Sequence, residues 1–227
     1  GKIIVPSQRF RKREGKIPKA VITRLPIYYR YLTDITTKTD RISSSELGKA
    51  LDITAAQIRS DLSYFGSFGL HGYGYNVDDL YSEIGKILGL DQEYKTVIVG
   101  AGNLGQAIVN YSFFEKSGFR TQGIFDTNPK IIGLKINEIE VYDVEILEDF
   151  VKEKGIDIGI ICTPRNQCQK IAEILSRGGI KAIWNFAPLD VKVSENIVVE
   201  NVHLSESLFT ISYLLNEKRE LMEAQKL

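Results

Sequence analysis

Short apolar runs alternate with longer amphipathic segments along the last two thirds of the chain. The apolar runs begin at Thr96, Thr121, Ile156 and Ile180. Runs of this length, bounded by glycine or proline, indicate buried strands, and strands that alternate with helices form a parallel sheet. The pattern therefore predicts an α/β domain with a doubly wound parallel sheet, in which helices cover 103–118, 143–155 and 166–179.

The first third of the chain has the pattern of several short helices. Apolar residues recur at helical spacing over 18–35, and Pro18 suits a first helical turn. Pro26 lies inside this segment, where a proline is expected to kink or interrupt a helix. A further helix over 77–88, closed by Gly89, leads to a domain boundary at 90–93.

Two capping signals lie between these helices. Ser43 and Glu46 have the spacing of a capping box, and Thr54 and Gln57 repeat it, so a helix should begin after each signal. Because only 52–53 connects the two helices, they are expected to cross steeply as a helix-turn-helix motif.

The later helix would then present its first turns to a DNA major groove. Gln57, Arg59 and Ser60 lie there. The following segment, "FGSFGLHGYGYNV", interleaves glycines with aromatic residues, which predicts a tight hairpin like the wing of a winged helix.

The C-terminal segment 205–224 also reads as a helix, with Ser205 as its cap. Its apolar residues, among them Leu208, Phe209, Ile211 and Leu215, cover more than one face. We therefore expect this helix to be buried on several sides, either against its own domain or in a second subunit.

Composition narrows the protein class. Of the 227 residues, 43% are hydrophobic and 26% charged, which is ordinary for a soluble globular protein. No apolar run approaches the roughly 20 residues of a membrane span, and the first residues lack a signal peptide's long apolar region. We expect a cytoplasmic protein with no membrane partner, and we interpret Cys162 and Cys168 as reduced core thiols.

The formal net charge of zero conceals an asymmetry. Residues 1–75 hold 13 Lys and Arg against 6 Asp and Glu, whereas 76–227 hold 16 against 23. A basic first third beside an acidic remainder favours nucleic acid as a partner of the first third, although a solvated basic tail would give the same excess.

A glycine fingerprint follows the first strand of the α/β domain. Gly100, Gly102 and Gly105 have the spacing G-x-G-x-x-G at the start of a helix, where backbone can approach a pyrophosphate. Asp126 ends the next strand, as expected of a carboxylate that binds the adenosine ribose and repels a 2′-phosphate. The motif predicts NAD(H) over NADP(H); alternatively, Asp126 caps a turn.

Catalytic residues are less evident than binding residues. The segments 162–165 and 185–188 should add cavity walls at the carboxyl ends of strands, yet neither supplies an evident acid or base. The two histidines are His71, in the expected wing, and His203, near the C-terminus. This argues against hydride-transfer catalysis, although Lys or Tyr could serve in their place.

The ordered motifs "RISSSELGKAL", "QIRSDLSYFGSFG", "GYGYNV", "VIVGAGNLG", "GIKAIWNFAP" and "ENV" closely resemble the bacterial redox-sensing repressors called Rex, from about Ile17 to Leu215. The resemblance implies a homodimer, not an enzyme, that leaves inverted-repeat operator DNA when NADH binds. It also implies a winged helix-turn-helix domain (17–90), a Rossmann-like NAD(H)-binding domain (91–204) and a C-terminal helix swapped between subunits (205–227). The charge pattern adds a basic arm (1–16) ahead of them, outside the resemblance.

The motifs and this resemblance together nominate the site residues. The expected cofactor-binding residues are Gly100, Ala101, Gly102, Asn103, Leu104, Gly105, Tyr111, Asp126, Thr163, Pro164, Asn185, Phe186, Ala187 and Pro188. The expected DNA-binding residues are Ser44, Ser45, Thr54, Gln57, Arg59, Ser60, Tyr64, His71 and Tyr73. Arg30 and His203 are expected to couple the two domains, and no metal site is expected.

Three residues depart from the family pattern. Ser60 and His71 stand where relatives usually carry basic residues, and His203 stands where they often carry Asp. The departures keep open a Rex paralogue with altered DNA binding or weak redox response. An NAD-dependent oxidoreductase, which would turn over a substrate, and a CoA-binding module, which the intact fingerprint and Asp126 disfavour, are further alternatives.

Overall fold

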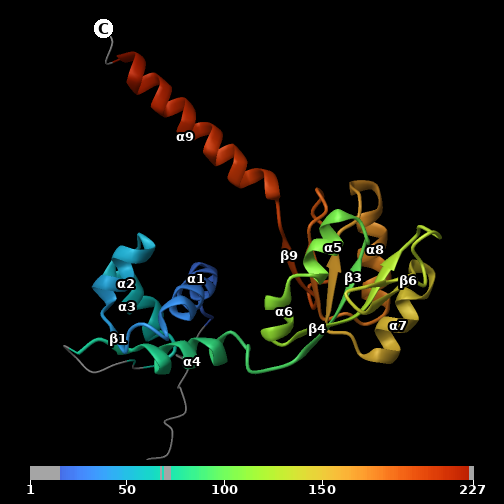
Figure 1. Cartoon of the computed structure of the whole chain (residues 1–227), viewed down its shortest axis with the longest axis horizontal. Coiled ribbons are helices and arrows are strands. Elements are labelled where there is room, and N and C mark those ends of the chain that lie inside the picture. The colour runs from blue at the N-terminus through green and yellow to red at the C-terminus, as the bar shows by residue number, and fades with distance from the viewer. Residues whose placement is uncertain (1–15, 67, 69–72, 225–227) are drawn as a thin grey trace, which may run out of the picture. The chain divides into compact units, whose positions relative to one another are not determined.

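A computed structural model describes residues 16–66, 68 and 73–224. The chain divides into two compact units, Gly1–Gln92 and Glu93–Leu227. In Figure 1 the elements of the first unit are drawn in blue to blue-green and those of the second in green to red. The expected His71 lies outside the described residues, as do Gly69 and Gly72 of the expected wing.

The first unit packs helices around one core. Its elements are α1 (Lys19–Ile35), β1 (Arg41–Ile42), α2 (Ser44–Leu51), α3 (Ala55–Ser63), β2 (Tyr75–Asn76) and α4 (Val77–Ile87). The core joins every helix, with Leu25 of α1, Leu47 of α2, Ile58 of α3 and Ile84 of α4 all buried. Two short antiparallel strands, β1 and β2, bring the segment after α3 back beside the start of α2.

Two local expectations for this unit are corrected. Helix α1 continues through Pro26 without interruption. Pro26 and Ile22 are both exposed, so the carbonyl that the proline leaves without a helical donor lies on the solvent side. Only half of the second capping box forms. The Thr54 hydroxyl accepts the Gln57 backbone N–H, but the Gln57 side chain donates to Asp61 instead of contacting the Thr54 backbone.

The second unit is the predicted doubly wound parallel sheet. Its strands are β3 (Tyr94–Val99), β4 (Phe119–Asp126), β5 (Lys135–Ile136), β6 (Ile139–Asp143), β7 (Ile158–Ile161), β8 (Ala182–Asn185) and β9 (Val198–Asn201). The described strands lie in the order β5-β6-β4-β3-β7-β8-β9, and all neighbours are parallel except β5 and β6. Strands β5, β6 and β9 were not predicted.

Helices cover both faces of this sheet. They are α5 (Asn103–Val109), α6 (Ser112–Lys116), α7 (Leu147–Lys154), which follows the 3₁₀ turn η1 (Val144–Ile146), and α8 (Arg165–Arg177). Val97 and Val99 pack with α7 and α8, whereas Ile98 packs with α5 on the opposite face. This alternation explains why β3 reads as a continuous apolar run.

The helix expected over 103–118 is two helices, which is a further correction. Tyr111 has φ −81° and ψ 91° and separates α5 from α6. The break lets Phe114 of α6 contact Trp184 of β8 edge-to-face, with ring centroids 5.4 Å apart. That contact joins residues far apart in sequence, which explains why local periodicity did not predict it.

The C-terminal helix α9 (Leu204–Ala224) begins one residue before the expected cap, so Ser205 lies inside the helix. Every described residue of α9 is exposed in the single chain, including Phe209 at 66% and Tyr213 at 67%. Helix α9 therefore does not pack against its own unit, which removes the first of the two expected ways of burying it.

Candidate functional site

The glycine turn after β3 is built by two glycines that the fold requires. Gly100 has φ +105°, and a Cβ placed there would lie 2.5 Å from the Cys162 carbonyl oxygen. A Cβ on Gly105 would lie 1.9 Å from the Gly100 carbonyl oxygen, so α5 can lie this close to β3 only with glycine there. A Cβ on Gly102, in contrast, would meet nothing within 4 Å. Gly102 thus leaves open space for a ligand.

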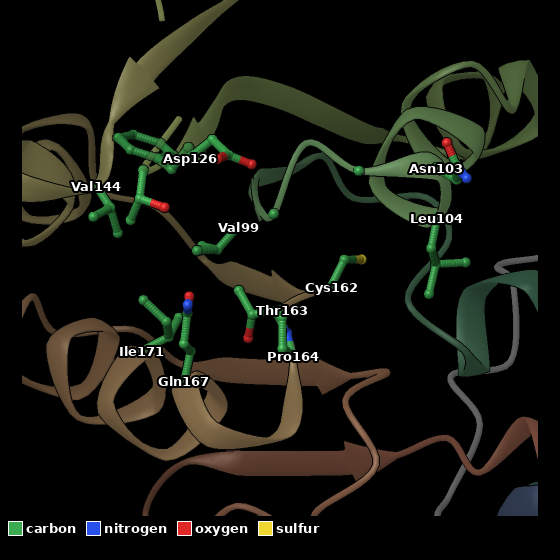
Figure 2. A pocket seen from close by; sticks show the side chains of 14 residues that line it. Val99, Asn103, Leu104, Asp126, Val144, Cys162, Thr163, Pro164, Gln167 and Ile171 are labelled. Carbon is green, nitrogen blue, oxygen red and sulfur yellow. The ribbon is translucent and has the colours of Figure 1, made fainter. Parts of the chain in front are cut away.

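This turn borders a cavity of about 490 Å³ at the carboxyl ends of β3, β4 and β7. Its position is the switch point of the sheet, because the chain runs from β3 to β4 on one side and continues through β7 on the other. Figure 2 shows Asp126 and Val144 on one side of the cavity and Gln167 and Ile171 on the other. Of the expected cofactor residues, the cavity gathers Gly100, Gly102, Asn103, Leu104, Asp126, Thr163 and Pro164.

Asp126 ends β4 and holds the turn in place. Its Oδ2 accepts the Ala101 N–H over 2.8 Å, and its Oδ1 accepts the Asn128 N–H over 2.8 Å. The second bond is the turn cap considered above, while the first ties the carboxylate to the glycine fingerprint. A carboxylate offers about four acceptor positions, so both oxygens keep capacity for further donors.

The end of β7 adds a buried hydroxyl to the cavity wall. Thr163 is 8% exposed, and its Oγ1 has no hydrogen-bond partner among the described residues. A buried polar atom without a partner is costly, so a polar ligand group in the cavity would stabilise it.

The two free cysteines lie in different surroundings. Cys168 is buried and its thiol donates to the Arg165 carbonyl, as expected of a core thiol. Cys162 is half-buried and lines the cavity, where burial raises the pKa of its thiol to about 12. The Cys162 thiol is therefore neutral at pH 7.

The remaining expected cofactor residues do not line this cavity. Tyr111 is 55% exposed and borders a second cavity of about 770 Å³. This second cavity lies on the face of the sheet that α5 and α6 cover. Asn185 is fully buried, and its amide nitrogen donates to the Leu189 carbonyl and to Asn201 Oδ1. Its own Oδ1 accepts the Ala187 N–H. Asn185 therefore shapes the segment 185–188 from inside.

The neighbours of Asn185 lie against other elements. The Phe186 ring contacts Trp184 at 4.6 Å between centroids. The Pro188 carbonyl oxygen accepts a hydrogen bond from Arg165 Nη1 at 3.3 Å.

In the first unit, Ser43 forms a complete capping box with Glu46 at the start of α2. Arg59 of α3 donates from Nη1 to Ser44 Oγ over 2.9 Å, which ties the exposed side of α3 to α2. Ser45, Thr54, Arg59 and Ser60 are exposed, Ser44, Gln57 and Tyr64 are half-buried, and Tyr73 is 72% exposed.

Two charged residues of this unit were not predicted. Asp61 of α3 is fully buried and accepts hydrogen bonds from Arg24 and Tyr28 of α1. Burial raises the pKa of the Asp61 carboxyl, but hydrogen bonds from Arg24, Tyr28 and Gln57 outweigh it and hold the pKa below its usual value. The signal was present in the sequence, because Asp61 falls on the apolar side of the predicted helix.

The expected coupling residues lie on different units. Arg30 is exposed on α1, and His203 immediately precedes α9. His203 Nε2 lies 2.8 Å from Asp190 Oδ1, so the histidine has an acidic partner within its own chain.

The described residues contain no group of three or more His, Cys, Asp or Glu that could hold a metal ion. No helix in the described part of the chain is long and apolar enough to cross a membrane.

Comparison with known proteins decides the family. The "Redox-sensing transcriptional repressor Rex" of Thermoanaerobacter pseudethanolicus is 57% identical over 208 residues, which cover 91% of this chain and 92% of that protein. This chain belongs to the Rex family. The Rex repressor of Clostridium tetani is 54% identical over 209 residues, covering 92% of this chain and 99% of the relative.

Family profiles and solved structures agree with Rex membership. Residues 16–63 match a profile described as "Putative DNA-binding protein N-terminus", and 91–189 match one described as "CoA binding domain". A crystal structure of the Rex-family repressor RSP with β-NAD⁺ and operator DNA has a TM-score of 0.86 and 55% identity, covering 93% of this chain and 98% of that one. RSP with β-NADH also has a TM-score of 0.86, with 53% identity over 93% and 100% of the chains.

Proposed function

We propose that this Rex-family protein represses transcription by binding operator DNA through its first unit and is released when NADH binds its second unit. The observation that carries the proposal is the cavity at the switch point, which the glycine turn, Asp126 and Thr163 line. The same chain contains a helix-turn-helix, in which both helices have side-chain caps. The RSP complexes with NAD⁺, NADH and operator DNA support the same function. The protein acts as a sensor rather than as an enzyme, in the cytoplasm.

The cavity residues fit a dinucleotide. The open side of Gly102 leaves room for a pyrophosphate at the N-terminus of α5, although this helix is short. Asp126 would accept the ribose hydroxyls and repel a 2′-phosphate, which favours NAD(H) over NADP(H). The buried Thr163 hydroxyl would gain the partner that it lacks.

Release from DNA by NADH alone requires that the closed dimer bind NADH with higher affinity than NAD⁺. NAD⁺ carries a positive charge on its nicotinamide ring, and NADH does not. We propose that Phe186, Tyr111 and the α9 helix of a second copy form an apolar surrounding that favours the neutral ring. Only such a difference in affinity can shift the equilibrium between a DNA-binding dimer and a closed dimer.

Helix α9 supports the dimer. Its exposed apolar side chains include Leu208, Phe209, Ile211, Leu214 and Leu215. A helix that is apolar on more than one side and exposed in a single chain needs a partner surface, and exchange between two copies supplies one. Arg30 and His203 are proposed to couple the cofactor domain to the DNA domain across this dimer.

The test is fluorescence anisotropy of a labelled inverted-repeat operator at fixed salt, titrated with NADH and then with NAD⁺. Tight binding that NADH reverses and NAD⁺ does not is the expected result. Equal responses to the two ligands would refute the redox mechanism. NADH binding without DNA binding in either state would instead favour the paralogue with altered DNA binding, for which the exposed Ser60 is the supporting observation.

A further inference from the structure

Asp61 has a saturated carboxylate. Its Oδ2 accepts from Arg24 Nε at 2.6 Å and from Tyr28 Oη at 2.6 Å. Its Oδ1 accepts from Arg24 Nη2 at 2.9 Å and from Gln57 Nε2 at 2.8 Å. A carboxylate has about four acceptor positions, so these four bonds use all of them. The side chain is 0% exposed, which makes the loss of any donor costly.

This arrangement fixes the orientation of the Gln57 amide. A carboxylate can only accept hydrogen bonds, so the amide nitrogen of Gln57, and not its oxygen, must face Asp61. Because Oε1 is repelled by the carboxylate, we expect Asp61 to take the amide hydrogen that points away from Oε1. The other amide hydrogen then lies on the same edge as Oε1. Within the described part of the chain, no hydrogen bond to Oε1 is formed.

Gln57 is also placed where a recognition helix reads bases. Thr54 caps α3, so Gln57 lies in its first turn, and the first turns of such helices contact base edges. The exposed residues of α3 include three small ones, Ala56, Ser60 and Ser63, which would allow close approach to a groove. The other long polar side chain of α3, Arg59, is tied to α2 through Ser44 Oγ.

We infer that Gln57 reads an adenine in each operator half-site, and that Asp61 is the positioning residue that holds its amide in the orientation adenine requires. The inference rests on the proposed function. Adenine offers an N6 donor and an N7 acceptor in the major groove, which match Oε1 and the free N–H of Gln57. Guanine offers acceptors at both O6 and N7, so its O6 would face Gln57 Oε1 and be repelled.

The experiment selects bound duplexes from a pool with a randomised inverted repeat and sequences them for the wild type and for Gln57→Met. Methionine keeps the length of the side chain and suits a helix, but it has no amide. The wild type is expected to prefer adenine at one position of each half-site by about tenfold, and Gln57→Met to lose that preference there alone.

Gln169→Met is the matched control. Gln169 of α8 donates to Glu173 Oε1 at 3.1 Å, which is also a glutamine–carboxylate pair at i, i+4, but it lies in the second unit. The base preference of this control variant should equal that of the wild type. Asp61→Asn retains Gln57 and should weaken the same adenine preference, a readout that a general loss of stability would not move.

The outcomes separate the two hypotheses. A wild type that selects no DNA overturns the proposed function and the inference together. If the wild type selects an operator, an unchanged adenine preference in Gln57→Met overturns the inference alone, as does an equal loss of affinity for all sequences. An unchanged preference in a folded Asp61→Asn overturns the positioning role. If that variant does not fold, Gln57→Met still decides for Gln57, and the wild-type protein decides for Asp61. The side-chain amide of Gln57 should be protected from hydrogen exchange by its bond to Asp61, and an unprotected amide overturns the positioning role.

Discussion

The Nε atom of Arg24 lies 2.6 Å from Oδ2 of Asp61, and this pair links α1 to α3 in the interior of the first unit. Removing one partner of a buried pair leaves the other charge with incomplete compensation. Without Arg24, Asp61 would still accept hydrogen bonds from Tyr28 and Gln57. We therefore expect removal of Arg24 to destabilise the first unit only in part.

We predict that Arg24→Ala lowers the free energy of unfolding of the first unit by roughly 1.5–3 kcal/mol at pH 7, the usual contribution of hydrogen bonds to a charged group. Arg120→Ala is the control, since Arg120 also donates twice to a carboxylate, Glu93, but both side chains are exposed. Little change is expected there. Hydrogen exchange in urea measures Arg24→Ala through the amides of α3 and Arg120→Ala through the amides of β4. Equal losses of stability in the two variants would contradict the prediction.

The same pair should make the first unit sensitive to acid. The pKa of Asp61 is lower in the folded chain than in the unfolded one. Its contribution to stability is therefore complete above the unfolded pKa of about 3.9 and is lost as pH falls through the lower folded pKa. Urea unfolding of the wild type and of Asp61→Asn at pH 6, 4 and 3 tests this. The prediction fails if the two proteins lose stability in parallel below pH 4.

The two glycines Gly102 and Gly105 should respond differently to alanine. Gly105→Ala places a Cβ 1.9 Å from the Gly100 carbonyl oxygen and should lower the free energy of unfolding of the second unit by about 1–3 kcal/mol. Gly102→Ala meets nothing within 4 Å and should cost less than about 1 kcal/mol, as the loss of a favourable helix start. It should nevertheless weaken NADH binding more than about tenfold, because its methyl group occupies the ligand's side. Thermal unfolding and NADH fluorescence titration separate the two effects.

Asp126→Ala is expected to weaken NADH binding by roughly 10- to 150-fold, the equivalent of about 1.5–3 kcal/mol for hydrogen bonds to a charged group. It should also reduce the discrimination against NADPH. Asp143→Ala is a close control, because Asp143 pairs in register with Asp126 on the neighbouring strand and caps a turn through the Glu145 N–H. Equal weakening by both variants in a fluorescence titration would argue that only the turns matter.

Ser60→Lys should raise DNA affinity and make it more dependent on salt. Ser60 is exposed on α3, so a lysine there can reach a phosphate without disturbing the core. One added phosphate contact steepens the slope of log K against log salt by about 0.9. Ser194→Lys adds the same charge at an exposed position of the second unit and should leave the slope unchanged. A slope that does not change in Ser60→Lys would place this position outside the DNA contact.

Much of the fold could be predicted because its signals are local. The capping box of Ser43 and Glu46 and the αL residue Gly89 mark helix ends through contacts within a few residues. The hairpin of β5 and β6 escaped prediction because its turn residues, Asn137 and Glu138, both have positive φ without a glycine. Asn137 is held there by the Val109 carbonyl, which is 28 residues away in sequence.

The sequence by itself determined the alternation of β3, β4, β7 and β8 with helices, the glycine turn after β3 and the placement of Asp126 at a strand end, because periodicity and turn geometry act over short distances. Only the tertiary structure decided that Asp61 gathers donors from α1, that Asn185 is used inside its own loop and that Thr163 keeps an unpaired hydroxyl in the cavity. Each of these depends on packing or on side chains from distant segments, and hydrogen bonding and burial of that kind arise only when the elements pack together.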